Sequence, residues 1–144
     1  MYPARMVPRD LEEESSDLVV YAARLTRAVR RRIAQPAGIR ILALLDELGP
    51  LGVTALAEAD RSSQPTVSGV VRQLEQLGWV AKAPDPSDAR RTLVRLTAEG
   101  RRPLVEVRRD NGLAVAERVA RTGHTAEDVA AAVALLRDVM DERL

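Results

Sequence analysis

The chain has 144 residues, 46% of them hydrophobic and 30% charged, and a net charge of +1 at pH 7, which is typical of one globular domain and excludes a disordered chain. It has no cysteine and one histidine, His124, so we expect no disulfide, no thiol chemistry and no metal site. No apolar segment is long enough to span a membrane and none resembles a signal peptide, so we expect a cytoplasmic protein with no membrane partner.

The first predicted element is a long helix. Residues 1–10 contain two prolines and no periodic pattern, and they are predicted to form a flexible tail. Apolar residues recur at helical spacing within 11–36, and the helix is predicted to start near Ser15 or Ser16. Pro36 ends this helix. A second, largely buried helix is predicted over residues 37–48, because its apolar residues cover a wide arc.

Two further helices are predicted in the middle of the chain. Thr54 is expected to cap a short helix over residues 55–60. Ser63 is expected to cap the next helix, 63–77. A proline in its first turn is typical of a helix start, and Gly78 is typical of the position just after a helix end.

Two strands and two helices complete the prediction. Apolar residues within 79–96 predict a hairpin, whose tip is expected to span about eight residues, 83–90, because prolines and aspartates cluster there. Thr97 is predicted to cap a long helix that runs to about Arg121. Thr125 begins the sequence Thr-Ala-Glu-Asp, which resembles a capping box and predicts the start of a last helix.

Helix, turn, helix and hairpin in this order predict a winged helix-turn-helix, a mainly α (α+β) fold in which residues 37–97 bind double-stranded DNA. A helix of this kind fits the major groove and presents residues near its N-terminus to base edges. Glutamine bonds adenine, arginine bonds guanine or phosphate, and a helix N-terminus attracts phosphate oxygens. The candidate contacts on the recognition helix and in the turn before it are Arg61, Ser63, Gln64, Thr66, Ser68 and Arg72.

The hairpin, here called the wing, supplies two further candidates. Arg90 and Arg91 lie at its extended tip, and an arginine at such a tip suits the minor groove, where negative potential is focused. The distribution of charge agrees with this interpretation. Residues 61–102 contain eight basic and four acidic side chains, whereas the rest of the chain contains 14 basic and 17 acidic ones. Such asymmetry indicates a local anionic partner.

Several short motifs follow one another in this region. They are Leu74-Glu75 and Gly78-Trp79-Val80, then Asp85-Pro86-Ser87-Asp88-Ala89-Arg90, then Leu96-Thr97-Ala98-Glu99-Gly100. In this order and spacing, the stretch 63–100 resembles the MarR family of bacterial transcription regulators, whose wing reads D-P-x-D-x-R and ends with L-T-x-x-G. The flanking helices extend the resemblance to residues 12–143.

The resemblance implies a homodimer in which residues 11–36 and 98–144 supply the dimerisation helices. It also implies that Arg90 enters the minor groove and that Asp88 holds this arginine by a salt bridge. A two-fold dimer matches a pseudo-palindromic operator with half-sites about one helical turn apart. The resemblance thus implies a sequence-specific, DNA-binding regulator of transcription, which we expect to be a repressor.

Two features depart from the family pattern. Gly69 lies inside the recognition helix, where many relatives have a larger residue, and this leaves the sequence preference open. The absence of cysteine and of a second histidine argues against oxidant and metal sensing, and no cofactor is expected. A small-molecule effector, with Tyr21, Arg24 and Arg40 as contributors, is left open, and its binding site is unknown.

Alternative interpretations of the same residues stay open. Arg90 and Asp88 could form a solvated surface pair without function, and Arg72 could pair with Glu75 three residues later. The alternative function is a winged helix that docks proteins without binding DNA, which predicts an apolar, exposed recognition helix. An enzyme is not expected, because the sequence offers neither a nucleophile with its base nor a glycine-rich phosphate loop.

Overall fold

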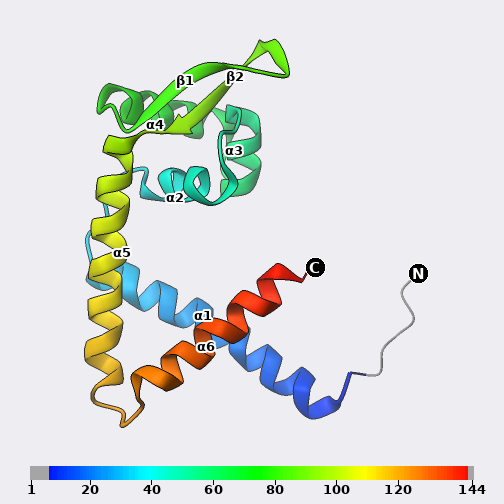
Figure 1. Ribbon diagram of the computed structural model, residues 1–144, viewed down its shortest axis with the longest axis vertical. Helices are drawn as coiled ribbons and strands as arrows, with labels where there is room; N and C mark the ends of the chain where they lie inside the picture. Colours follow the sequence, from blue (N-terminus) through cyan, green and yellow to red (C-terminus); the bar gives the residue numbers. More distant parts are fainter. Residues whose placement is uncertain (1–6, 143–144) are drawn as a thin grey trace. The chain divides into compact units, whose positions relative to one another are not determined.

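The computed structural model describes residues 7–142, which are mostly helical with one small antiparallel sheet (Figure 1). This confirms the predicted fold class. In chain order the elements are α1 (Arg9–Arg32), α2 (Ile39–Leu48), α3 (Val53–Asp60), α4 (Gln64–Gln76), β1 (Val80–Asp85), β2 (Asp88–Leu96), α5 (Ala98–Val119) and α6 (Ala126–Asp141). Residues 1–6 of the predicted tail lie outside the described part of the chain. None of the helices within residues 7–142 has the length and apolar character needed to cross a membrane.

The chain forms two compact units. The winged-helix unit, Ala34–Asp110, contains α2, α3, α4, both strands and the first part of α5. The helical unit contains α1, the remainder of α5 from Asn111, and α6. The predicted division after residue 97 differs from this one. Leu104 and Val107 of α5 belong to the core of the winged-helix unit, so the first turns of this helix pack with that unit.

The core of the winged-helix unit is built by α2, α3, α4 and the sheet. Leu42, Leu56, Val71 and Val94 have no exposed surface. Because burial of such a side chain contributes about 1.5–3 kcal/mol, these residues hold the three helices against the hairpin. Leu51 exchanges two backbone hydrogen bonds with Val94, at 3.1 and 2.8 Å, which anchors the loop between α2 and α3 to β2.

The predicted start of the first helix near Ser15 is wrong, because α1 begins earlier, at Arg9. The backbone N–H of Glu12 donates to the carbonyl of Pro8 at 3.1 Å, which closes the first turn without a side-chain cap. Arg9 and Glu13 form an ion pair at 3.1 Å. Acidic residues in a first turn are also stabilised by the helix dipole, a signal that the apolar periodicity does not contain.

The predictions for α4 are confirmed at both ends. The Ser63 Oγ accepts a hydrogen bond from the Thr66 N–H at 3.2 Å, and Pro65 occupies the first turn. After the helix, Gly78 adopts a φ of +73°, a left-handed conformation that glycine tolerates best. Local sequence signals are therefore sufficient to define the helix that carries most of the candidate residues.

Thr54 is not the N-cap of α3, contrary to the prediction. This helix begins at Val53, and its N-cap is Gly52, which makes no side-chain hydrogen bond. The Thr54 Oγ1 instead accepts a hydrogen bond from the Gln64 Nε2 at 3.2 Å. A threonine is a good cap in isolation, but here its hydroxyl has a partner on α4.

The turn of the hairpin is much shorter than the predicted stretch 83–90. β1 and β2 pair as far as Pro84 opposite Thr92, and after an irregularity Asp85 pairs with Asp88. The tip is therefore an extension of the sheet and not a loose loop. Proline and aspartate correctly indicate a turn, but they do not show that side-chain hydrogen bonds tighten it.

The predicted capping box of α6 is confirmed. The Thr125 Oγ1 accepts from the Asp128 N–H at 3.2 Å, and the Asp128 Oδ2 accepts from the Thr125 N–H at 2.8 Å. The hydrogen bonds from Thr125, and then that from His124, hold the pKa of Asp128 below its ordinary value. At pH values above the ordinary pKa of an aspartate, this cap therefore stabilises α6. The stabilisation is lost as the pH falls and Asp128 becomes protonated.

Gly69 allows a test of helix propensity inside α4. A Cβ at this position would meet no heavy atom within 4 Å, so alanine fits without displacing a neighbour. We predict that Gly69→Ala raises the free energy of unfolding by up to about 1 kcal/mol, because glycine is the poorer helix former. Urea unfolding followed by circular dichroism measures the change. Gly78→Ala is the contrasting variant and should destabilise, because φ at Gly78 is +73°. A lower stability for Gly69→Ala would contradict the prediction.

Candidate nucleic-acid interface

The first turn of α4 presents polar side chains to solvent. Ser63, Gln64 and Thr66 are exposed, and Ser68 is half-buried. The hydroxyl of Ser63 caps the helix and also forms a 2.7 Å hydrogen bond with the hydroxyl of Thr66. This surface is polar, whereas the protein-docking alternative predicts an apolar one.

Gln64 is held by a neighbour that sequence reasoning misses. Its Nε2 donates to the Thr54 Oγ1 at 3.2 Å, which ties the start of α4 to α3 and orients the amide. The second N–H and the carbonyl oxygen of this amide are then the groups left for a ligand. A single threonine on the preceding helix carries no sequence signal for such a contact, so only the fold identifies it.

The turn between α3 and α4 is fixed by Asp60. This carboxylate accepts a hydrogen bond from the Ser62 hydroxyl at 2.5 Å and pairs with Arg40 of α2 at 2.8 Å. Arg40 also donates to the backbone carbonyl of Asp60 at 3.1 Å. Arg61 follows with a φ of +55° and an exposed side chain. Arg40, a candidate for effector binding, is thus engaged in holding the turn that displays Arg61.

Arg72 lies two turns along α4 from its N-terminus and is exposed. Within the residues that the structure describes, neither Arg72 nor Arg61 has an ion-pair partner, and no pair joins Arg72 to Glu75. Both guanidinium groups are therefore open to an anionic ligand. An arginine is always charged at physiological pH and carries five N–H donors, which suits phosphate oxygens and guanine.

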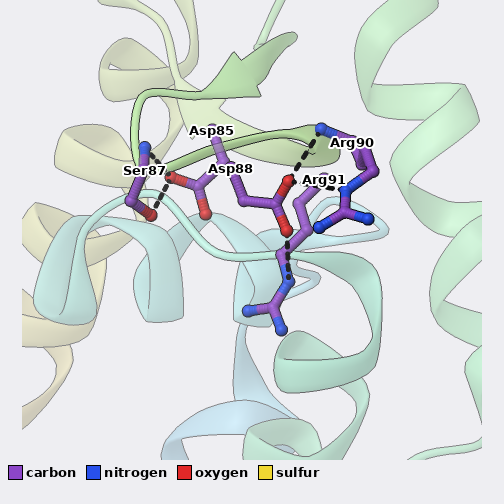
Figure 2. Close-up of polar contacts among 5 residues, drawn as sticks. All are labelled: Asp85, Ser87, Asp88, Arg90 and Arg91. Carbon is purple, nitrogen blue, oxygen red and sulfur yellow. Dashed lines mark hydrogen bonds and ion pairs between the residues drawn. The ribbon is translucent and has the colours of Figure 1, made fainter.

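Asp88 organises the two arginines at the tip of the wing (Figure 2). Its Oδ1 accepts hydrogen bonds from the backbone N–H of Arg90 at 3.1 Å and from the Arg90 Nε at 3.3 Å. Its Oδ2 lies 3.8 Å from the Arg91 Nε. The ion pair between Asp88 and Arg90 that the family resemblance implies is thus present. The Arg90 side chain is nevertheless 92% exposed. Asp88 therefore holds its Nε, and the outer part of the guanidinium group is open to a ligand.

Asp85 and Ser87 shape the turn that carries this pair, as Figure 2 shows. The Asp85 Oδ1 accepts hydrogen bonds from the Ser87 N–H at 2.9 Å and from the Ser87 hydroxyl at 2.7 Å. These bonds, the backbone one first, lower the pKa of Asp85. Neither residue is among the sequence candidates, although both belong to the motif Asp-Pro-Ser-Asp-Ala-Arg. Their contribution is to fix the tip on which Arg90 is displayed.

Arg91 lies on a different side of the hairpin from Arg90 (Figure 2). It lines a groove of about 640 Å³ between the start of α3 and the wing, together with Glu58 and Asp85. Two carboxylates therefore share this groove with its guanidinium group. The surroundings of Arg91 are less favourable to a phosphate than those of Arg90, although the side chain is 76% exposed.

The structure brings all the candidate residues into the winged-helix unit. The candidates lie on α4, in the turn before it and on the wing, and they are Arg61, Ser63, Gln64, Thr66, Ser68, Arg72, Asp88, Arg90 and Arg91. Four exposed arginines in this set favour an anionic ligand. Between residues 7 and 142, no three His, Cys, Asp or Glu side chains come together in a way that would hold a metal ion.

Comparison with known proteins identifies relatives of the chain. The MarR family model matches residues 36–92. An HTH-type transcriptional regulator of Mycobacterium bovis is 31% identical over 133 residues, which cover 89% of this chain and 93% of that protein. The solved structure of a transcriptional regulator from Pseudomonas aeruginosa is 28% identical with a TM-score of 0.68, and it covers 95% of this chain and 99% of that one.

A further solved structure is similar in fold alone. It is BpsR from Bordetella bronchiseptica, whose DNA binding is regulated by 6-hydroxynicotinic acid, with 24% identity, a TM-score of 0.56, and coverage of 88% of this chain and 98% of that one. The family model falls on the winged-helix unit, and the Mycobacterium bovis relative matches most of the chain. The chain therefore belongs to the MarR family of transcriptional regulators.

Proposed function

We propose that this protein is a repressor that binds a pseudo-palindromic operator as a homodimer, with α4 in the major groove and the wing in the minor groove. The observation that carries the proposal is the geometry of Arg90. Its side chain is 92% exposed at the tip of a tight hairpin and is held from one side by Asp88. A guanidinium group fixed on an extended tip suits the minor groove, where the negative potential is focused.

The first turns of α4 make the contacts in the major groove. Gln64 bonds an adenine with the part of its amide that Thr54 leaves free. The exposed hydroxyls and arginines around it bond base edges or phosphate oxygens. These further contacts are assigned to Arg61, Ser63, Thr66, Ser68 and Arg72.

The wing contributes one groove contact and one backbone contact. Arg90 enters the minor groove, and Asp88 restricts its side chain so that less conformational entropy is lost on binding. Arg91 is assigned to the phosphate backbone beside the groove, because it lies on a different side of the strand. Both contacts position the protein on the duplex, while α4 supplies most of the sequence preference.

The apolar surface of the helical unit supports the homodimer. α6 exposes Val129, Val133, Leu136 and Met140 at spacings of four, three and four residues, so that they lie along one face of the helix. A contiguous exposed apolar stripe is typical of a surface that another molecule covers. A two-fold dimer then presents two copies of α4 to half-sites about one helical turn apart.

A small-molecule effector would relieve repression by changing the separation of the two α4 helices. Only one separation matches the two half-sites, so a ligand that favours another separation lowers operator affinity. The regulation of BpsR by 6-hydroxynicotinic acid supports this part of the proposal. A compound that releases the operator without unfolding the protein would identify such an effector.

Fluorescence anisotropy with a labelled duplex from the region upstream of the protein's own gene tests DNA binding. We expect affinity to fall steeply with salt, because contacts with phosphates release counterions. A random duplex of equal length is the control and should bind more weakly. Absence of binding to both duplexes at low salt would reject the proposal and favour a winged helix that docks proteins.

Asp88→Asn tests whether Asp88 acts by positioning Arg90. The amide keeps the size of the carboxylate but not its charge, so Arg90 is held less firmly. Because an exposed ion pair is worth about 0–1 kcal/mol, we predict that operator affinity falls by up to about fivefold. Affinity for a random duplex should fall by no more than this, since the wing contact does not depend on sequence and one negative charge near the phosphates is removed. An operator affinity that is unchanged or higher would contradict the positioning role.

A further inference from the structure

A hydrogen bond between two exposed side chains joins α3 to α4. The Gln64 Nε2 donates to the Thr54 Oγ1 at 3.2 Å. Thr54 belongs to the first turn of α3, and Gln64 is the first residue of α4. The contact therefore lies at the surface that the proposed function places in the major groove, although Thr54 itself is not among the candidate residues.

The backbone on both sides of this contact is held by the core. Leu56, two residues after Thr54, and Val67, three residues after Gln64, are both buried. Leu51, three residues before Thr54, exchanges two backbone hydrogen bonds with β2. Packing thus places the two helices, and the hydrogen bond has only to restrict the side chain of Gln64.

An unanchored glutamine discriminates weakly between bases. Rotation about the last bond of its side chain is broad and roughly two-fold, so the amide oxygen and nitrogen exchange places easily. In the major groove, adenine presents an acceptor at N7 and a donor at N6, whereas guanine presents two acceptors, at N7 and O6. An amide with two free N–H groups and a free oxygen can turn to suit either pattern.

Thr54 removes part of this freedom. One of the two N–H groups of the Gln64 amide is used in the bond to the Thr54 Oγ1, which leaves one N–H and the carbonyl oxygen for a ligand. One donor with one acceptor matches adenine, whereas guanine requires two donors. On either side of Gln64, the hydroxyls of Ser63 and Thr66 bond each other at 2.7 Å, so the anchor of the amide is Thr54.

We propose that Thr54 is a specificity-determining residue that acts through Gln64, because its hydroxyl holds the amide in the state that selects adenine over guanine. This inference rests on the DNA binding proposed above and names a residue that sets base preference there. Thr54 is a positioning residue outside the recognition helix. Its hydroxyl controls the discrimination between bases more than the total affinity for DNA.

Thr54→Val tests the proposal, because valine keeps the branched shape of threonine without the hydroxyl. The probe is the duplex from the region upstream of the protein's own gene, with each base pair varied in turn, and fluorescence anisotropy gives the affinities. The base pair that Gln64 reads is the one at which Gln64→Ala abolishes discrimination. At this pair we expect Thr54→Val to lower the ratio of affinities for adenine and guanine by about twofold to tenfold, the net worth of one hydrogen bond.

Two matched variants show whether the hydroxyl is responsible. Thr54→Ser keeps the hydroxyl and should keep the ratio. Thr92→Val makes the same chemical change at an exposed position of β2 and should also leave the ratio unchanged. An unchanged ratio in Thr54→Val, or an equal fall in either matched variant, would overturn the proposal, as would a parent that prefers guanine at this base pair. Partial unfolding does not imitate the effect, because each ratio compares duplexes on the same protein.

The same substitution in the Gln64→Ala protein identifies the route of the effect. If Thr54 acts through Gln64, Thr54→Val should not change the ratio any further in that protein. A direct contact between the Thr54 hydroxyl and a phosphate would instead lower the affinity for every duplex equally, with or without the Gln64 amide. A uniform loss with an unchanged ratio would therefore overturn the proposal.

The parent and the Gln64→Ala protein separate this inference from the proposed function. A parent that binds no duplex at low salt would reject DNA binding and this inference together. A parent that binds, but whose base preferences are the same in Gln64→Ala, would reject the base contact of Gln64 and the role of Thr54 while DNA binding stands. Loss of adenine preference in Gln64→Ala but not in Thr54→Val would reject the role of Thr54 alone.

Discussion

Arg90→Ala is expected to lower operator affinity by about tenfold to a hundredfold, which corresponds to about 1–3 kcal/mol. The variant should also reduce the slope of log affinity against log salt concentration by about one, because one contact with the phosphate-rich groove is lost. The effect is large because Asp88 already restricts this side chain, so the wild-type arginine binds with little loss of entropy. Fluorescence anisotropy at several salt concentrations gives both quantities.

The fold of the Arg90→Ala variant should be unchanged. The Arg90 side chain is 92% exposed, and an exposed pair with Asp88 contributes little to stability. Arg95→Ala is a matched control: Arg95 lies on the same strand and is exposed, but it sits in the paired part of the sheet opposite Ala81. We expect a smaller loss for Arg95→Ala. Undiminished DNA binding by the Arg90→Ala variant would remove the wing from the interface.

Equal losses of operator affinity in the Arg90→Ala and Arg95→Ala variants would lead to a different conclusion. They would show that the total charge of the wing, and not the position of its tip, determines affinity. Such a result would leave DNA binding intact as a function but would reject the assignment of Arg90 to the minor groove. The comparison of Arg90→Ala with Arg95→Ala therefore tests geometry separately from charge.

Sequence reasoning succeeds where structure is determined by neighbouring residues. The Ser63 cap of α4, the left-handed Gly78 and the capping box at Thr125 all depend on contacts within four residues. The pairing of Asp88 with Arg90 has the same short range, which is why a family motif can imply it. Local hydrogen bonds of this kind leave a readable pattern of residue types.

Sequence reasoning fails where a contact joins distant residues. Thr54 is a plausible cap by type, but its hydroxyl accepts from Gln64, on another helix. The division after residue 97 misplaces the first turns of α5 for the same reason, because Leu104 packs into the core of the winged-helix unit. Neither contact has a local signal. Among the candidate residues, the orientation of the Gln64 amide is thus the feature that only the folded chain reveals.

Gly100→Ala is expected to destabilise the protein by about 3 kcal/mol or more, which is the upper range for overpacking. A Cβ on Gly100 would lie 2.1 Å from the carbonyl oxygen of Trp79 and 2.9 Å from the Leu96 Cδ1. The first of these atoms belongs to the backbone, so it cannot move aside by a change of side-chain rotamer. Domains of this size have only about 5–15 kcal/mol of stability in total, so the loss is a substantial fraction of it.

The hydrogen bonds around Gly100 explain why the wing would be affected. The Trp79 carbonyl accepts from the Thr97 N–H at 3.1 Å, and the Thr97 hydroxyl donates to the Gly78 carbonyl at 2.6 Å. The N–H of Gly100 donates to the same hydroxyl at 3.1 Å. Moving Trp79 away from a new methyl group would break this network at the base of the wing, where β1 begins and β2 ends.

Urea unfolding and operator binding together test the Gly100→Ala prediction. Gly69→Ala is the matched control, because it adds the same methyl group to a helical glycine of the same unit with no heavy atom within 4 Å. We expect stability to fall in the first variant and to rise in the second. Because the root of the wing shifts, the folded fraction of the Gly100→Ala variant should also bind the operator more weakly. Unchanged stability in Gly100→Ala would mean that α5 and the hairpin can separate without cost, and the wing could then not hold Arg90 at a fixed position.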